Sequence, residues 1–177
     1  MSFRPNGQES SLSKPYLRYL RIGTKNYLRA GHAALVLIDK STGNLEYFDF
    51  GRYTTPKGYG RVRGKETDNE LDFPLRAEIK NKHIVNLDEI LSYLATHSQL
   101  THGEGKMLAS VCNAVNHEKA RRFIEKMQQE HFTRYGAFIR KASNCSRFVT
   151  DTLIASVANK NIKKQLIKST WFTPSTV

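Results

Sequence analysis

The 177-residue sequence has few cysteines, few acidic residues and no long apolar run. Its two cysteines, Cys112 and Cys145, are too few for a disulfide framework and indicate a reducing compartment. No window reaches the roughly 18 consecutive apolar residues of a membrane-spanning helix. Residues 1–10 also lack the apolar run of a secretion signal. We therefore predict a cytoplasmic protein without a transmembrane segment.

Several kinds of site are excluded by missing motifs. The sequence has no glycine-rich phosphate loop of either common type and no Gly-x-Ser-x-Gly elbow for a serine nucleophile. His97, His102, Cys112 and His117 could be assembled into a set of metal ligands, but no Cys-x-x-Cys or His-x-x-x-His pairing supports such a site. We expect neither a metal ion nor another cofactor.

Lysine and arginine outnumber the acidic residues, 28 against 16, which gives a net charge of +12. An excess of this size favours anionic partners such as nucleic acid, an acidic polymer or anionic lipid. The cations are spread along the chain, so a solvated basic surface is favoured over an anionic ligand as the explanation of the excess.

The length and the 39% hydrophobic content suit one domain, 1–177, with a core of its own. Residues 1–14 are rich in Ser, Asn and Gly and are expected to form a flexible arm. Residues 159–177 carry four lysines and are expected to form a basic tail.

A β-hairpin is the clearest structural pattern. Residues 31–38 form an uncharged run with the length of a buried strand. Residues 39–44 have turn composition, and the aromatic stretch 45–50 predicts a second strand. The turn is expected to centre on residues 41 and 42.

Other segments complete an α+β prediction, a small antiparallel sheet packed against helices. Apolar spacing and capping residues predict helices at 87–94, at 117–129 and from about residue 145. Further strands are expected at 71–79 and 106–111, extended structure at 132–138, a glycine- and arginine-rich loop at 51–64, and either a strand or a short helix at 16–22.

Cys145 stands where a polar segment passes into an apolar helical pattern, so it is predicted in the first turn of a helix. Backbone N–H groups and the helix dipole lower a thiol pKa at that position, which favours the nucleophilic thiolate. The alternative is a buried cysteine that only fills the core.

A thiol nucleophile needs a base, and His32 is the best placed of six histidines because it opens the uncharged strand. The hairpin register brings His32 opposite roughly Asp49 to Gly51, so Asp49 is the candidate that orients the imidazole. Glu46 is the fallback, because a slip of one residue would reverse the faces of the strand.

Residues near these three are candidates for substrate contact. Arg52, Tyr53 and Tyr59 lie in the predicted loop, where planar donors and aromatic rings can hold a ligand. Asn144 directly precedes Cys145 and can add a donor to an oxyanion site.

The order of a histidine on the first strand, an acid on the next and a cysteine at a late helix start resembles the circularly permuted papain-like cysteine enzymes. This is the branch of the NlpC-type superfamily that includes lecithin:retinol acyltransferase-like proteins, and a bacterial family within it fits best. The resemblance is carried by residues 31–37, 47–51 and 144–148.

The resemblance implies a permuted papain-like fold and thiol-mediated acyl transfer on a peptide, amide or ester through a thioester. It assigns Cys145 as nucleophile, His32 as base and Asp49 as orienting group. The third residue in such enzymes is often His, Glu or Gln, so Asp49 departs from the usual pattern.

A non-catalytic basic binding module for nucleic acid or another anionic polymer is the alternative function. Its ligand would contact Arg52, Tyr53, Tyr59, Arg61 and Arg63. Affinity for a polyphosphate ligand would fall steeply with salt.

Overall fold

The computed structural model describes residues 23–24, 27–28, 31–102, 106–136 and 139–172. The chain divides into two compact units, residues 1–31 with 177 and residues 32–176. In the first unit, β1 (Gly23–Thr24) and β2 (Tyr27–Leu28) form an antiparallel pair. The expected arm at 1–14 and the ambiguous segment 16–22 lie outside the described residues.

An antiparallel sheet with strand order β3-β4-β5-β8 forms the centre of the second unit. Its strands are β3 (Ala34–Ile38), β4 (Leu45–Gly51), β5 (Tyr59–Arg63) and β8 (Thr133–Arg134). Strands β3 and β4 are the predicted hairpin, with Ala34 paired to Asp49 and Ile38 to Leu45. This register centres the turn between residues 41 and 42, as predicted.

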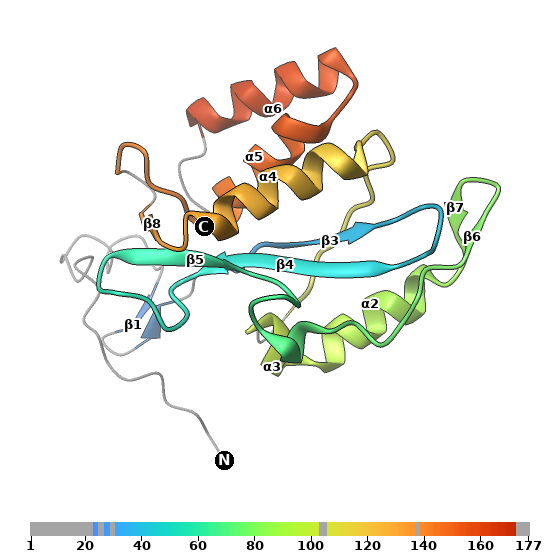
Figure 1. Cartoon of the computed structure of the whole chain (residues 1–177), viewed down its shortest axis with the longest axis horizontal. Coiled ribbons are helices and arrows are strands. Elements are labelled where there is room, and N and C mark those ends of the chain that lie inside the picture. The colour runs from blue at the N-terminus through green and yellow to red at the C-terminus, as the bar shows by residue number, and fades with distance from the viewer. Residues whose placement is uncertain (1–22, 25–26, 29–30, 103–105, 137–138, 173–177) are drawn as a thin grey trace. The chain divides into compact units, whose positions relative to one another are not determined.

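Helices cover both faces of this sheet (Figure 1). They are α2 (Leu87–Thr96), α3 (Ser98–Thr101), α4 (His117–Gln129), α5 (Cys145–Ser156) and α6 (Lys160–Phe172). On one face, Phe48 and Phe50 of β4 pack with Ile124 of α4 and Phe148 of α5. On the other, Leu45 packs with Ala77 and with Ile90 of α2.

The α+β prediction is therefore confirmed, and helices occur at all three predicted positions. The predicted cap of α4 is also present, because the Asn116 side chain accepts a hydrogen bond from the Lys119 N–H at 2.9 Å. The stretch expected as a basic tail contains α6, which packs on α5. No helix in the described part of the chain is long and apolar enough to cross a membrane.

The prediction of a loop at 51–64 is wrong for its second half, because residues 59–63 form β5, which lies between β4 and β8 in the sheet. Gly60 suggested a loop, but a Cβ at this position would come within 2.8 Å of the Phe50 ring. This glycine serves close packing inside a strand, which composition does not distinguish from a turn.

Two other predicted strands are also wrong. Residues 71–79 contain the end of a 3₁₀ helix, η1 (Asn69–Leu71), then irregular chain, and only the start of β6 (Ile79–Lys80), which pairs with β7 (His83–Ile84). Residues 106–112 are exposed and irregular. A strand requires a second backbone that hydrogen-bonds to it, which an apolar pattern cannot supply alone.

Candidate active site

Cys145 is the first residue of α5 and is only 5% exposed. Asn144 precedes it in an extended conformation, and its side-chain oxygen accepts a hydrogen bond from the Arg147 N–H at 2.8 Å. This is a helix N-cap, which holds the first turn in one geometry. Cys145 therefore lies at the positive end of the helix dipole.

His32 lies just before β3 and contacts both other residues of the predicted triad. Its Nε2 is 3.0 Å from Oδ2 of Asp49, and because an ionised carboxylate only accepts, Nε2 donates. The ring also hydrogen-bonds the Cys145 side chain. Because Nε2 is engaged by Asp49, Nδ1 is the ring nitrogen available to the sulfur. The structure thus brings Cys145, His32 and Asp49 together.

The pKa of His32 reflects these neighbours. Burial lowers this pKa, but the hydrogen bonds to Asp49 and Cys145 and the charges of both residues raise it, to about 9. An imidazole with this pKa carries a proton at neutral pH.

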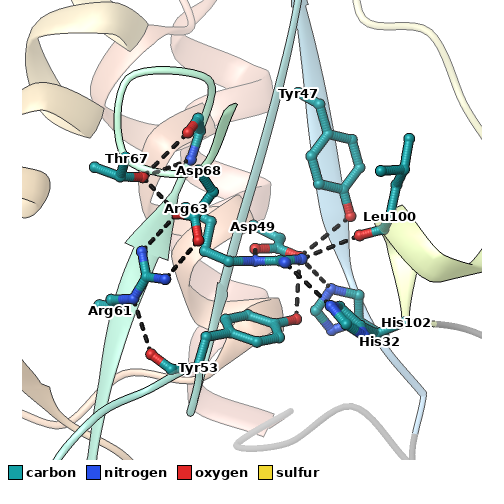
Figure 2. Close-up of polar contacts among 11 residues, drawn as sticks. His32, Tyr47, Asp49, Tyr53, Arg61, Arg63, Thr67, Asp68, Leu100 and His102 are labelled. Atoms are coloured by element: carbon teal, nitrogen blue, oxygen red, sulfur yellow. Dashed lines mark hydrogen bonds and ion pairs between the residues drawn. The ribbon is translucent and has the colours of Figure 1, made fainter. Parts of the chain in front are cut away.

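Asp49 is completely buried and accepts hydrogen bonds from four side chains (Figure 2). Besides His32, Oδ2 accepts from the hydroxyls of Tyr47 at 3.2 Å and Tyr53 at 3.1 Å, and both oxygens accept from Arg63. Burial alone would raise the pKa of Asp49, but His32 and Arg63 lower it to about 2. Asp49 is therefore ionised throughout the range in which His32 titrates.

Arg63 is the main residue of this cluster that the sequence did not place beside the triad, because it was expected in a ligand-binding loop. Its Nε and one terminal nitrogen donate to Asp49 at 3.0 and 2.7 Å, and its guanidinium lies 3.7 Å from the centre of the Tyr53 ring. Asp49 and Arg63 are directly paired across β4 and β5. This register would have revealed the pair if residues 59–63 had been read as a strand.

The four candidates for substrate contact have different environments. Tyr53 belongs to the Asp49 cluster, and Asn144 serves as the helix cap. Tyr59 is on β5 and is 38% exposed. Arg52 is exposed, and its guanidinium lies 5.3 Å from the centre of the Tyr135 ring.

Glu46, the fallback for the third residue, lies on the opposite face of β4 from Asp49. There it forms an ion pair with Arg121 and lies 3.6 Å from Nε2 of His117. The carboxylate that contacts His32 is that of Asp49. Among the described residues, no group of three or more His, Cys, Asp or Glu side chains could hold a metal ion.

A family model described as "Type VI secretion system effector TseH-like" matches residues 5–162. The matched span includes Cys145, His32 and Asp49. No curated protein matches the chain, and neither does any solved structure.

Proposed function

Since the chain belongs to the type VI secretion system effector TseH-like family, we propose that it is an effector with cysteine-dependent hydrolase or acyltransferase activity. Its substrate would be a peptide, another amide or an ester. The observation that carries the proposal is the hydrogen-bonded series from Asp49 through His32 to Cys145 at the start of α5. His32 precedes Cys145 along the chain, which supports a circularly permuted papain-like arrangement of the NlpC type.

In the proposed reaction, His32 already holds the proton of the Cys145 thiol in the resting thiolate–imidazolium pair, and the thiolate attacks the carbonyl carbon of the substrate. The positive end of α5 stabilises the negative oxygen of the tetrahedral intermediate. His32 then returns the proton to the leaving amine or alcohol, and a thioester remains on Cys145. Water, or a second acceptor in the case of transfer, attacks the thioester while His32 removes its proton, and the C–S bond breaks to release the acyl product and the Cys145 thiolate.

Asp49 would hold the imidazole in one orientation and one tautomer. Its bond to Nε2 directs Nδ1 toward the sulfur. The ionised carboxylate also stabilises the imidazolium that forms when Cys145 loses its proton.

Alkylation of Cys145 by iodoacetamide tests the proposed thiolate–imidazolium pair. A Cys112→Ser background removes the exposed second thiol, and mass spectrometry follows labelling across pH. Because the pKa of His32 is about 9, we expect Cys145 to react at neutral and mildly acidic pH. A His32→Gln variant should move the midpoint toward the roughly 8.5 of an ordinary thiol. Identical profiles for the two proteins would contradict the proposal.

The alternative of a basic binding module is not favoured by the arginines it requires. Arg61 forms a two-pronged ion pair with Asp68, at 2.6 and 2.5 Å, and also donates to the Tyr53 carbonyl oxygen. Arg63 is buried against Asp49. Two of the three arginines are thus held by internal carboxylates.

Arg52 is the arginine of this region that we expect to meet substrate. It contacts Tyr135, whose pKa is raised by burial and by the charge of Cys145, so both side chains border the proposed site. Among the described residues, Arg52 forms no ion pair with a carboxylate.

Two esters of equal acyl length test this role, 4-nitrophenyl hemisuccinate with a carboxylate and 4-nitrophenyl butyrate without one. Arg52→Ala is expected to lower kcat/KM for the hemisuccinate about fivefold, equivalent to loss of one exposed ion pair of about 1 kcal/mol. The value for the butyrate should stay within about twofold, and Arg52→Lys should retain part of the preference. Equal losses on both esters would argue against a carboxylate contact.

A further inference from the structure

The carboxylate that contacts His32 is also one half of a buried ion pair. Arg63 is 3% exposed, and it engages both oxygens of Asp49 (Figure 2). A buried carboxylate without a cation would have a raised pKa and would tend to be neutral. Arg63 therefore keeps Asp49 ionised, and the two-pronged contact restricts rotation of the carboxylate.

Arg63 is itself held from a distant part of the chain. One terminal nitrogen donates to the Leu100 carbonyl oxygen at 3.0 Å, and the other lies 3.0 Å from Nε2 of His102. A guanidinium can only donate, so Nε2 of His102 accepts and this imidazole is neutral, with its proton on Nδ1. Burial and the charge of Arg63 lower the pKa of His102, in agreement with a neutral ring.

These contacts form a continuous series from α3 and the residue after it to the proposed nucleophile. Leu100 and His102 hold Arg63, Arg63 holds Asp49, and Asp49 holds His32. The Tyr53 ring packs against the Arg63 guanidinium, and the Tyr53 hydroxyl donates a hydrogen bond to Asp49.

We propose that Arg63 is a positioning residue of the site, held by Leu100 and His102, which orients Asp49 and thereby the His32 ring that faces Cys145. The effect on Cys145 reactivity rests on the proposed function, whereas the effect on Asp49 does not. No contact of Arg63 with substrate is involved.

Several titratable groups surround the pair and act on it. The groups in contact with the Asp49–Arg63 pair are His32, Tyr47, Tyr53 and His102. The groups that act through their charge without contact are Cys145, Arg61, Asp68 and, on His102, Glu70. Of these, the pKa of His102 is lowered, whereas those of Tyr47 and Tyr53 are raised, mainly by burial. Neither tyrosine therefore ionises in the acidic range where the test is made.

Arg63→Met, with Arg63→Lys for comparison, tests the proposal in the Cys112→Ser background. Carbon NMR follows the Asp49 carboxyl, and iodoacetamide follows Cys145. In Arg63→Met we expect the carboxyl midpoint to rise by at least about one pH unit and Cys145 alkylation near about pH 5 to fall roughly tenfold, because a protonated Asp49 no longer orients His32. Arg63→Lys should give an Asp49 midpoint and a Cys145 alkylation rate between those of the wild type and Arg63→Met. A purely structural role would lower stability without moving the acid limb of alkylation.

Two substitutions at the exposed His102 keep the test decisive if Arg63→Met fails to fold. His102→Gln retains an acceptor for Arg63, and His102→Leu removes it without adding charge. We expect His102→Gln to match the wild type in the Asp49 titration and in the pH profile of Cys145 alkylation. His102→Leu should raise the Asp49 midpoint and lower Cys145 alkylation in acid, as Arg63→Met does. Equal profiles for Gln and Leu, or a raised Asp49 midpoint with unchanged alkylation, would overturn the positioning role. If wild-type Cys145 is not alkylated, the proposed function fails, and the Asp49 titration still decides whether Arg63 and His102 act on that carboxyl.

Discussion

Replacement of Cys145 with alanine is expected to abolish turnover of 4-nitrophenyl butyrate, with kcat/KM falling on the order of 10⁴-fold. The thiol sulfur forms the bond to the acyl group, and no other described side chain is placed against His32 to take over that role. Cys145→Ser should also be inactive, since a hydroxyl with a much higher pKa is not ionised by an imidazole that acts well on a thiol.

The matched control is Cys112→Ser, which removes the exposed cysteine and should leave turnover unchanged. Thermal unfolding separates loss of chemistry from loss of fold. Cys145→Ala removes one buried sulfur and should cost only about 1 kcal/mol of stability. Turnover that persists in Cys145→Ala and disappears in Cys112→Ser would refute the assignment of the nucleophile.

Asp49→Asn is expected to have the largest effect on stability, lowering the free energy of unfolding by about 3–5 kcal/mol. The amide has almost the same shape, but it leaves the buried Arg63 without a counter-charge and its NH₂ group cannot accept. Activity should fall as well, because His32 loses the ionised partner on Nε2. Urea denaturation at neutral pH measures the first effect, and ester turnover measures the second.

A double variant, Asp49→Asn with Arg63→Met, provides the control. Removal of both charges should recover much of the stability lost in the single variant, because no unpaired ion remains buried. Activity should not return, since His32 is still without its carboxylate. A single variant within about 1 kcal/mol of the wild type would show that the pair contributes little to the fold.

The pKa of Asp49 also determines how the free energy of unfolding changes in acid. The folded pKa of Asp49 is about 2, below the unfolded value of about 3.9. Its contribution is therefore present above about pH 3.9 and is lost as the pH falls toward the folded pKa. This acid-dependent loss should be absent from Asp49→Asn.

Much of the fold followed from patterns within short stretches. The uncharged strand, the turn at 39–44 and the aromatic strand predicted the hairpin and the centre of its turn, and the structure decided between the two faces that a slip of one residue had left open. Helix starts at 87 and 117 followed from apolar spacing after an asparagine, although Asn116 caps its helix with its side chain and Asn86 does not, and the start at 145 followed from apolar spacing. The residues of the proposed triad were also named from the sequence, because Asp49 lies on that hairpin and His32 just before it.

Prediction was poorest where the partner of a segment lies elsewhere in the chain. Residues 59–63 have loop composition, but they are held as a strand by β4 on one side and β8, more than 70 residues later, on the other. Residues 106–111 have the composition of a strand and no such partner among the described residues. Composition reports the preference of a segment, whereas strand formation depends on a second backbone.

The sequence by itself determined the hairpin, the helices α2 and α4 and the position of Cys145 at the start of α5, because hydrophobic periodicity, turn residues and caps act within one or two turns of chain. Only the tertiary structure decided that Asp49 is a buried ion as well as the partner of His32. That outcome depends on Arg63, on His102 a further 39 residues along the chain, and on the exclusion of water from Asp49 and Arg63. Burial and charge pairing are properties of the packed chain, so no local pattern could show that the orienting carboxylate has a cation of its own.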